Sequence, residues 1–286
     1  MYDTILVTGA TSNIGSEVLR LLSMDEVEVR GATDDLREAR KVLPKGIELV
    51  RFDFKEKDTY EKALEGVKKV LIIAPPEDID VKEHVFPFID KAKQMGVLQI
   101  IFISILGIDK NPLAQHRRIE KYLKEIEVPY TIIRPSYFMQ KLNTMYRHEI
   151  KVQGKIMIPA GKAKINFIDV RDVAAFTARV ICEENEHFNM IYKVTGKEAI
   201  TYHEAAEIFS NTAGKNVEYV NPKIKEFKQL MVKKGLEGEK LKRITRLCIT
   251  SRLGIGRKVT NDFKKVMGTD PKSFEHYIND YKNMWK

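Results

Sequence analysis

Short apolar segments alternate with segments of helical spacing over the first half of the chain. The first apolar segment, residues 4–8, leads into a glycine-rich turn, after which Ile14, Val18 and Leu22 recur on one helix face. The other apolar segments predict strands at residues 27–32, 47–52, 70–74, 98–104 and 130–134. Because these segments are apolar on both faces, they indicate a parallel sheet covered by helices on each side.

The segments between these strands have helical spacing and end at helix-stopping residues. We predict helices at residues 36–43, 58–64, 85–95 and 117–126, with Pro44, Gly66 and Gly96 just beyond three of them. Right-handed crossovers between parallel strands then give an α/β fold with a Rossmann doubly wound parallel sheet.

This regular alternation ends after Arg134. Residues 136–150 have helical spacing and are rich in Met and Tyr, and Thr201 with Glu204 forms a capping-box pattern at a helix start. The other elements expected here are strands at 164–170 and 190–194, a helix at 171–182, and mostly helices from Pro222.

We therefore expect two domains. The Rossmann domain comprises residues 1–135, with 164–195 packing back onto it. Residues 136–163 and 196–286 form a smaller, mostly helical substrate or lid domain.

The turn between the first strand and the first helix carries the clearest chemical signal. It reads Gly-Ala-Thr-Ser-Asn-Ile-Gly from Gly9 to Gly15, where a dinucleotide-binding turn is expected. Gly9 permits the tight turn, Gly15 permits close packing of the helix on the strand, and the helix N-terminus attracts phosphate. Ser12 replaces the middle glycine, which restricts the approach of the backbone to a ligand. The candidate phosphate-binding residues are Gly9, Thr11, Ser12, Asn13, Ile14 and Gly15.

The end of the second strand bears on the choice between NAD and NADP. Asp34 lies there, where a carboxylate binds the ribose hydroxyls and repels a 2′-phosphate. This favours NAD(H) slightly, although Arg30 and Arg37 leave NADP open. Asp34 is also a candidate N-cap for the helix at Leu36, and the two roles are compatible.

Composition adds limits to this picture. The net charge is +9, and residues 215–286 hold 18 Lys/Arg against 8 Asp/Glu, so the basic excess lies in this last segment. Within it, residues 244–259 are basic and amphipathic. Such a segment can contact nucleic acid or lipid, but we prefer a lid over a substrate cleft and disfavour nucleic acid.

The two cysteines, Cys182 and Cys248, form no metal-ligand pattern, and no metal site is expected. Without an apolar run of membrane-spanning length or an export signal, the expected location is the cytoplasm.

Several ordered segments resemble the NmrA-like branch of the atypical short-chain dehydrogenase/reductase superfamily. They are VTGATSNIG at residues 7–15, Phe52-Asp53-Phe54, Ala74-Pro75-Pro76, FISILG at 102–107, His116 to Lys121, YTIIRPSYFMQ at 130–140, FIDVRD at 167–172 and VTG at 194–196. Each segment is unspecific, but the ordered set covers nearly the whole chain. The resemblance implies NAD(P)H as the cofactor.

The resemblance also implies residue roles. It places Asp53 and Phe54 beside the adenine, and Ser104 near the nicotinamide ribose. It assigns Ala74, Pro75 and Pro76 to the ribose and nicotinamide side. Tyr137 and Phe138 would border the nicotinamide and the substrate, with Met139 beside them in an apolar or aromatic pocket; a plain core stripe is the alternative for these three residues.

Catalysis is where the chain departs from the superfamily. No Tyr-x-x-x-Lys follows the fifth strand, and His116 with Glu120 stands in its place. Histidine can relay a proton near neutral pH, and Glu120, one helical turn on, could orient it. Lys121 is the next charged candidate. The alternative is that His116 and Glu120 are a pair at a helix start without chemistry.

Three functions are consistent with these residues. The first is an NAD(P)H-dependent oxidoreductase that passes hydride directly to a quinone-like, conjugated carbonyl or azo acceptor, a small apolar or aromatic molecule. The second is a catalytically silent NAD(P)H sensor that docks a protein partner. The third, a sugar-nucleotide epimerase, ranks last because its chemistry needs an active-site tyrosine or equivalent base.

Overall fold

The computed structural model describes residues 4–25, 27–73, 75, 79–111, 114–183 and 185–285. The chain divides into two compact units. The first unit is Met1–Pro135 with Val170–Lys193, and the second is Ser136–Asp169 with Val194–Lys286. Residues 164–169 and 194–195, expected with the Rossmann domain, belong to the second unit in this division.

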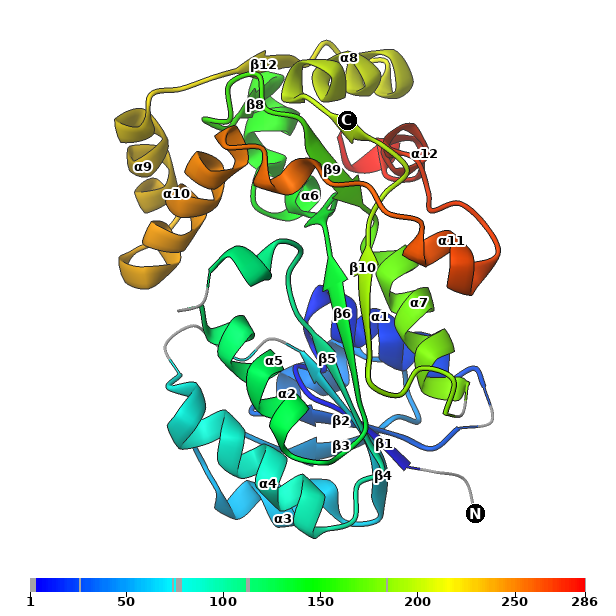
Figure 1. Cartoon of the computed structure of the whole chain (residues 1–286). Helices are drawn as coiled ribbons and strands as arrows, with labels where there is room; N and C mark the ends of the chain where they lie inside the picture. The colour runs from blue at the N-terminus through cyan, green and yellow to red at the C-terminus, as the bar shows by residue number, and fades with distance from the viewer. Residues whose placement is uncertain are drawn as a thin grey trace. The chain divides into compact units, whose positions relative to one another are not determined.

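A seven-stranded sheet forms the centre of the first unit, as Figure 1 shows. Its strand order is β10-β6-β5-β4-β1-β2-β3. The strands are β1 (Thr4–Val7), β2 (Val29–Thr33), β3 (Glu48–Arg51), β4 (Val67–Ile73), β5 (Gln99–Ile103), β6 (Tyr130–Pro135) and β10 (Met190–Val194). Neighbours from β3 to β6 pair in parallel. This order is that of a Rossmann sheet, so the predicted fold class is confirmed.

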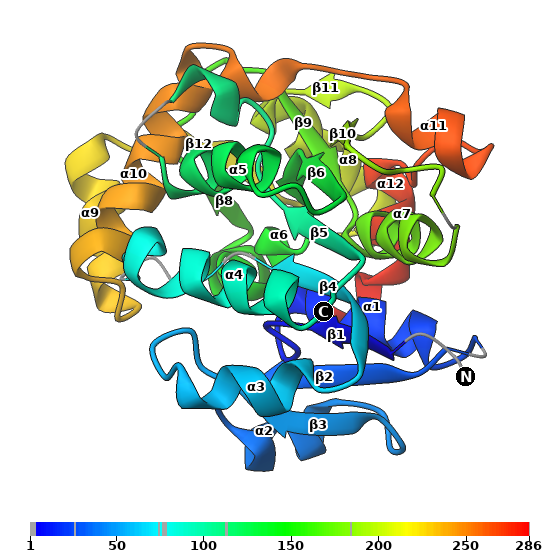
Figure 2. The same cartoon turned by 60° about the horizontal axis from the view of Figure 1, so that its bottom comes forward.

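Helices cover both faces of this sheet (Figures 1 and 2). One face carries α3, α4 and α5, and its core includes Phe88 and Ile119 against Ile72 and Phe102. The helices α1 and α7 pack against each other on the other face. The helices of this unit are α1 (Asn13–Leu22), α2 (Leu36–Val42), α3 (Asp58–Leu64), η1 (Val81–Val85), α4 (Phe86–Gln94), η2 (Ile108–Lys110), α5 (Gln115–Glu125) and α7 (Val170–Cys182).

The second unit combines two small sheets with most of the C-terminal helices. One sheet has the order β11-β9-β7 and the other joins β12 to β8. The strands are β7 (Tyr137–Phe138), β8 (Lys155–Met157), β9 (Ile165–Ile168), β11 (Ala199–Ile200) and β12 (Glu218–Val220). The helices are α6 (Lys141–Thr144), η3 (Glu149–Gln153), α8 (Tyr202–Ala213), α9 (Ile224–Lys233), α10 (Gly238–Arg252), η4 (Ile255–Arg257), α11 (Asp262–Met267), α12 (Phe274–Asp280) and η5 (Lys282–Met284).

The start of the second unit differs from the predicted helix at residues 136–150. Tyr137 and Phe138 instead form β7, which pairs in parallel with Phe167 and Ile168 of β9. The main-chain N–H of Met139 then donates to the carbonyl of Ile168. The prediction of one continuous helix is therefore wrong, because pairing with a distant strand overrides local helical spacing.

The predicted capping box at the start of α8 is present. Thr201 Oγ1 accepts from the N–H of Glu204, and the Glu204 carboxylate accepts from the N–H of Thr201 at 2.6 Å. Both orphan donors at this helix start are thereby satisfied.

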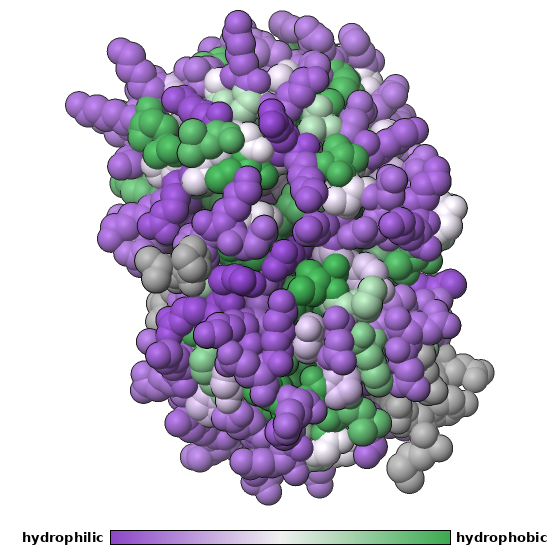
Figure 3. Space-filling model, viewed as in Figure 1, coloured by the Kyte–Doolittle hydropathy of each residue, from purple (hydrophilic) through white to green (hydrophobic). Residues whose placement is uncertain are grey.

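The surface seen in Figure 3 is mainly hydrophilic, with hydrophobic side chains in separate small groups. In the basic segment, Ile244 and Cys248 of α10 are buried, whereas Ile249 and Leu253 are exposed. Among the residues that the structure describes, no helix is both long and apolar enough to cross a membrane.

Candidate functional site

The turn from β1 to α1 is built on two glycines with different tasks. Gly9 has φ +59°, a left-handed conformation that favours glycine. Gly15 is helical, but a Cβ added there would lie 2.3 Å from the carbonyl oxygen of Gly9. Because backbone cannot yield as a flexible side chain does, only glycine fits at position 15. The turn is thus as tight as a pyrophosphate-binding loop requires.

Ser12 is the N-cap of α1. Its Oγ accepts from the N–H of Gly15 at 3.1 Å and so satisfies one N–H of the first turn. The N–H groups of Asn13 and Ile14 remain at the helix end, where the helix dipole favours an anion. The Ser12 hydroxyl keeps its own hydrogen to donate, and Thr11 and Asn13 are exposed. The residue that departs from the glycine pattern is therefore the cap of this helix end.

The two aspartates after β2 have separate positions, although both helix capping and ribose binding were predicted for Asp34. Asp35 is the N-cap of α2, and its Oδ1 accepts from the N–H groups of Arg37 and Glu38. The prediction that Asp34 caps this helix is wrong, because the helix starts one residue later than that role requires. Asp34 is exposed, and its carboxylate contacts only loosely the hydroxyl of Thr33, at 3.5 Å. The carboxylate of Asp34 therefore takes no part in capping α2.

The loop after β3 places its two candidates differently. Asp53 is partly exposed, and its carboxylate accepts from the N–H of Lys55 at 2.8 Å. Phe54 is buried and packs edge-on against Phe52 and Phe88. Its main-chain carbonyl, in turn, accepts from the hydroxyl of Tyr60. The loop is therefore held in shape by a buried aromatic cluster, and Asp53 is partly exposed between the buried Phe52 and Phe54.

The segment after β4 is only partly described. Pro75 is buried. Ala74 and Pro76, also predicted on the cofactor side, lie outside the described residues.

Ser104, at the end of β5, belongs to a buried polar cluster with Glu120 and Arg134. Ser104 Oγ donates to Glu120 Oε1 at 2.6 Å. Arg134 Nε donates to the same oxygen at 2.8 Å, and its Nη2 donates to Oε2 at 2.6 Å. Glu120 is fully buried, and its carboxylate holds the pKa of the Arg134 guanidinium above its usual value. This two-pronged ion pair satisfies the buried charges and fixes the Ser104 hydroxyl.

His116, Glu120 and Lys121 all lie on α5, but the short bonds described for Glu120 are with Ser104 and Arg134, and its longer contact, 3.5 Å, is with Arg117 of the same helix. The ring of His116 packs against Phe102, with centroids 5.4 Å apart. Lys121 is exposed and lies 3.8 Å from Glu125. Both oxygens of Glu120 are thus occupied by hydrogen bonds from Ser104 and Arg134.

Tyr137, Phe138 and Met139 belong to the second unit. The hydroxyl of Tyr137 hydrogen-bonds with those of Tyr146 and Tyr202, and burial raises the pKa of Tyr137 to about 12. Phe138 is half-buried, and Met139 is buried in the core of this unit. Tyr137 is therefore a protonated phenol at neutral pH.

A family model described as the NmrA-like family matches residues 1–278. The chain belongs to the NmrA-like family. The resemblance drawn from the ordered motifs is confirmed.

Relatives of this NmrA-like chain match it over most of its length. "Uncharacterized oxidoreductase YesF" of Bacillus subtilis is 30% identical over 287 residues, 99% of this chain and 96% of that protein. The NAD(P)H azoreductase of Xenophilus azovorans is 32% identical over 238 residues, 81% of this chain and 82% of that protein. A solved structure, the NADPH-dependent quinone oxidoreductase QOR2 of Escherichia coli complexed with NADPH, is 25% identical. It superposes with a TM-score of 0.84 and covers 96% of this chain and 99% of its own.

The sequence reasoning missed Arg134, although the sequence carries a signal for it. Arg134 follows the apolar residues of β6 and precedes Pro135, so a charged side chain stands in an otherwise buried strand. A buried arginine needs a carboxylate partner. That requirement would have directed attention to Glu120 as its partner.

Proposed function

We propose that this NmrA-like chain is an NAD(P)H-dependent oxidoreductase that reduces a quinone-like, conjugated carbonyl or azo acceptor. The observation that carries the proposal is the tight turn from Gly9 to Gly15. A Cβ at position 15 would collide with the carbonyl oxygen of Gly9, so this geometry requires glycine there. The names of the azoreductase and quinone oxidoreductase relatives support the acceptor class.

The residues of the first unit fit the cofactor. The N–H groups of Asn13 and Ile14 and the hydroxyl of Ser12 would hold the pyrophosphate. Asp34 would bind the adenosine ribose, and Ser104 would bind the nicotinamide ribose with its hydroxyl fixed by Glu120. When bound, the reduced nicotinamide supplies a hydride.

The proton that completes the reduction needs a different source. Addition of one hydride to a quinone gives the hydroquinone monoanion, and one proton then gives the neutral hydroquinone. His116 is the proton donor that we propose for the chain, because the Glu120 carboxylate is committed to Arg134 and Lys121 points to solvent. We assign Glu120 a positioning role through Ser104.

The test is oxidation of NADH and of NADPH with a panel of quinones and azo compounds. We expect turnover with at least one flat acceptor. His116→Gln should lower kcat and leave cofactor affinity unchanged, whereas Ser104→Ala should weaken cofactor binding. If the chain binds NADH or NADPH measurably but turns over none of the acceptors, the proposed oxidoreductase function is wrong.

Asp34 is proposed to favour NADH over NADPH. Its carboxylate is exposed, and Asp35 alone caps α2. Asp34→Arg should therefore shift the ratio of NADPH to NADH affinity at least tenfold toward NADPH without lowering stability. Asp35→Asn, which keeps a capping oxygen, is the matched control and should leave the ratio unchanged. An unaltered ratio in Asp34→Arg would refute this role.

The second candidate is a catalytically silent NAD(P)H sensor. The buried Glu120–Arg134 pair favours it, since a structural ion pair stands where an acid–base pair was expected. Capture of a protein partner that changes with added NADPH, together with absent turnover, would support the sensor over the enzyme.

A further inference from the structure

The connection between α7 and β10 brings together three groups that can bind a metal. Glu183, Glu186 and His187 each offer a ligand atom, and these atoms all lie within 4.8 Å of one another. The three residues belong to the first unit. They lie by the start of β6, where Thr131 contacts His187, whereas the Gly9–Gly15 turn follows the end of β1. The cluster is thus at the opposite end of the sheet from the proposed cofactor site.

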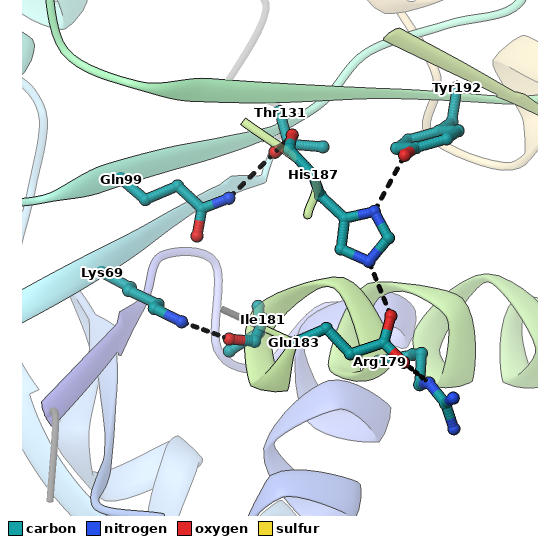
Figure 4. Close-up of polar contacts among 8 residues, drawn as sticks. All are labelled: Lys69, Gln99, Thr131, Arg179, Ile181, Glu183, His187 and Tyr192. Atoms are coloured by element: carbon teal, nitrogen blue, oxygen red, sulfur yellow. Dashed lines mark hydrogen bonds and ion pairs between the residues drawn. The ribbon is translucent and has the colours of Figure 1, made fainter. Parts of the chain in front are cut away.

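The imidazole of His187 is held in one orientation, as Figure 4 shows. His187 is 5% exposed. Its Nδ1 lies 2.8 Å from the hydroxyl of Tyr192, and its Nε2 lies 2.7 Å from a Glu183 oxygen. Its main-chain carbonyl accepts from Thr131 Oγ1, which in turn accepts from Gln99 Nε2. A ring fixed through Nδ1, with Nε2 directed at carboxylates, has the arrangement of a metal-binding histidine with its outer-shell partner.

The two carboxylates differ in how they are held. Glu183 bonds with His187 through Oε2 and with Arg179 through Oε1. Glu186 is exposed. Glu183 is therefore held against the imidazole, and Glu186 can turn toward the cluster without disturbing the core.

We propose that Glu183, Glu186 and His187 form a binding site for a divalent transition metal, with zinc as the fitting ion. One imidazole, two carboxylates and a water make a four-coordinate zinc site, whereas Mg²⁺ and Ca²⁺ prefer oxygen ligands alone. The ion inserts between His187 Nε2 and Glu183 Oε2, and Arg179 keeps its bond with the other oxygen of Glu183.

Such an ion links the end of α7 to the sheet. Glu183 directly follows α7, and His187 is bonded to Tyr192 of β10 and Thr131 of β6. Because the ion binds a folded arrangement of ligands, its binding free energy adds to the stability of the first unit. The site is structural, and hydride transfer does not require it.

The test is thermal unfolding of the full chain after treatment with EDTA, with and without added ZnCl₂. Zinc at about 100 times its Kd should raise Tm by about 3 °C or more, and MgCl₂ and CaCl₂ at equal concentration should not. Glu186→Gln should leave Tm without metal unchanged, because this side chain is exposed, and should abolish the zinc shift. Glu65→Gln, also at an exposed glutamate of the first unit, is the matched control and should keep the shift.

Cobalt gives a second readout that does not depend on stability. Co²⁺ should bind with a visible absorption band typical of a low-coordinate histidine and carboxylate site, and Glu186→Gln should lose that band. His276, whose Nε2 lies 3.3 Å from an Asp280 oxygen, is another surface position that could bind zinc or cobalt, and binding there would persist in Glu186→Gln. A zinc shift or cobalt band that persists in Glu186→Gln, or the absence of any zinc effect on the unaltered chain, would overturn the proposal.

Discussion

Two polar regions of the first unit, the Gly9–Gly15 turn and the Ser104–Glu120–Arg134 cluster, are specified in opposite ways. The turn depends on backbone geometry within seven consecutive residues, and its groups face outward at a helix end. The cluster joins β5, α5 and β6, and its charges are buried and satisfied by one another. The turn is therefore built from neighbouring residues, as its proposed role in phosphate binding requires, whereas the cluster holds one hydroxyl in place through residues far apart in the sequence.

The difference has an energetic side. Substitutions in the turn should mainly lower cofactor affinity, because the N–H groups of Asn13 and Ile14 are the groups proposed to bind the pyrophosphate. Altering the cluster should first affect folding, because a buried charge left alone is costly. Substitutions in each region test this division.

The largest expected effect is that of Glu120→Ala. It removes the short bonds that the buried Arg134 guanidinium makes with Glu120 and leaves the 3.5 Å contact with the exposed Asp109. This should lower the free energy of unfolding by about 3–5 kcal/mol. Urea unfolding measures the loss. The double variant Glu120→Ala with Arg134→Met removes both charges and should recover more than half of it; no recovery would mean that the ion pair is not the cause.

Gly15→Ala should have the next largest effect. The added Cβ meets the Gly9 carbonyl oxygen at 2.3 Å, so the turn must open. We expect a loss of about 1–3 kcal/mol in unfolding free energy, as for overpacking, and a loss of NADPH affinity of at least tenfold. Fluorescence titration measures the affinity. Gly46→Ala, at a glycine with open space around it but φ +96°, controls for backbone strain without a clash and should keep full affinity.

Ser12→Ala and Thr201→Ala each remove an N-cap hydrogen bond, the first at the start of α1 and the second at the start of α8. Each residue is an N-cap whose side chain accepts from the N–H three residues on. Each substitution should cost about 1 kcal/mol of unfolding free energy. Only Ser12→Ala should weaken NADPH binding, because α8 belongs to the second unit and carries none of the proposed phosphate-binding groups. Equal losses of affinity would remove the special role of Ser12.

The smallest effect concerns pH. Hydrogen bonds from Thr201, first from its main-chain N–H, hold the pKa of Glu204 below its usual range. A carboxylate whose pKa is lower in the folded state adds stability above its unfolded pKa of about 4.3 and loses it as pH falls through the folded value. The stability difference between the unaltered chain and Glu204→Gln should therefore shrink below about pH 4. A difference that stays constant from pH 7 to pH 3 would contradict this linkage.

The same division between local and long-range features decides what the sequence could predict. The glycine turn, the parallel strands and the capping box at Thr201 and Glu204 follow from residues close in sequence, and the structure contains them. The helix predicted over residues 136–150 failed because β7 pairs with β9, about thirty residues later. Helical spacing contains no information about such a partner.

The cap of α2 and the partners of Glu120 show the same limit of prediction from local sequence. Asp34 and Asp35 offer the same capping chemistry, and only the start of α2 decides that Asp35 is the cap. Glu120 matched a catalytic position by its spacing from His116. Its bonds with Ser104 and Arg134, on two neighbouring strands, could not be deduced from that spacing.

The adjacent aspartates after β2 also bear on how such a chain can change over evolution. Since Asp35 alone secures the start of α2, position 34 can mutate without loss of foldability. With the role proposed for Asp34, a substitution at that position alone would let a descendant use a different pool of reductant while the scaffold stays intact. For an engineer, the same proposed role would make cofactor choice a separate adjustment from thermal stability.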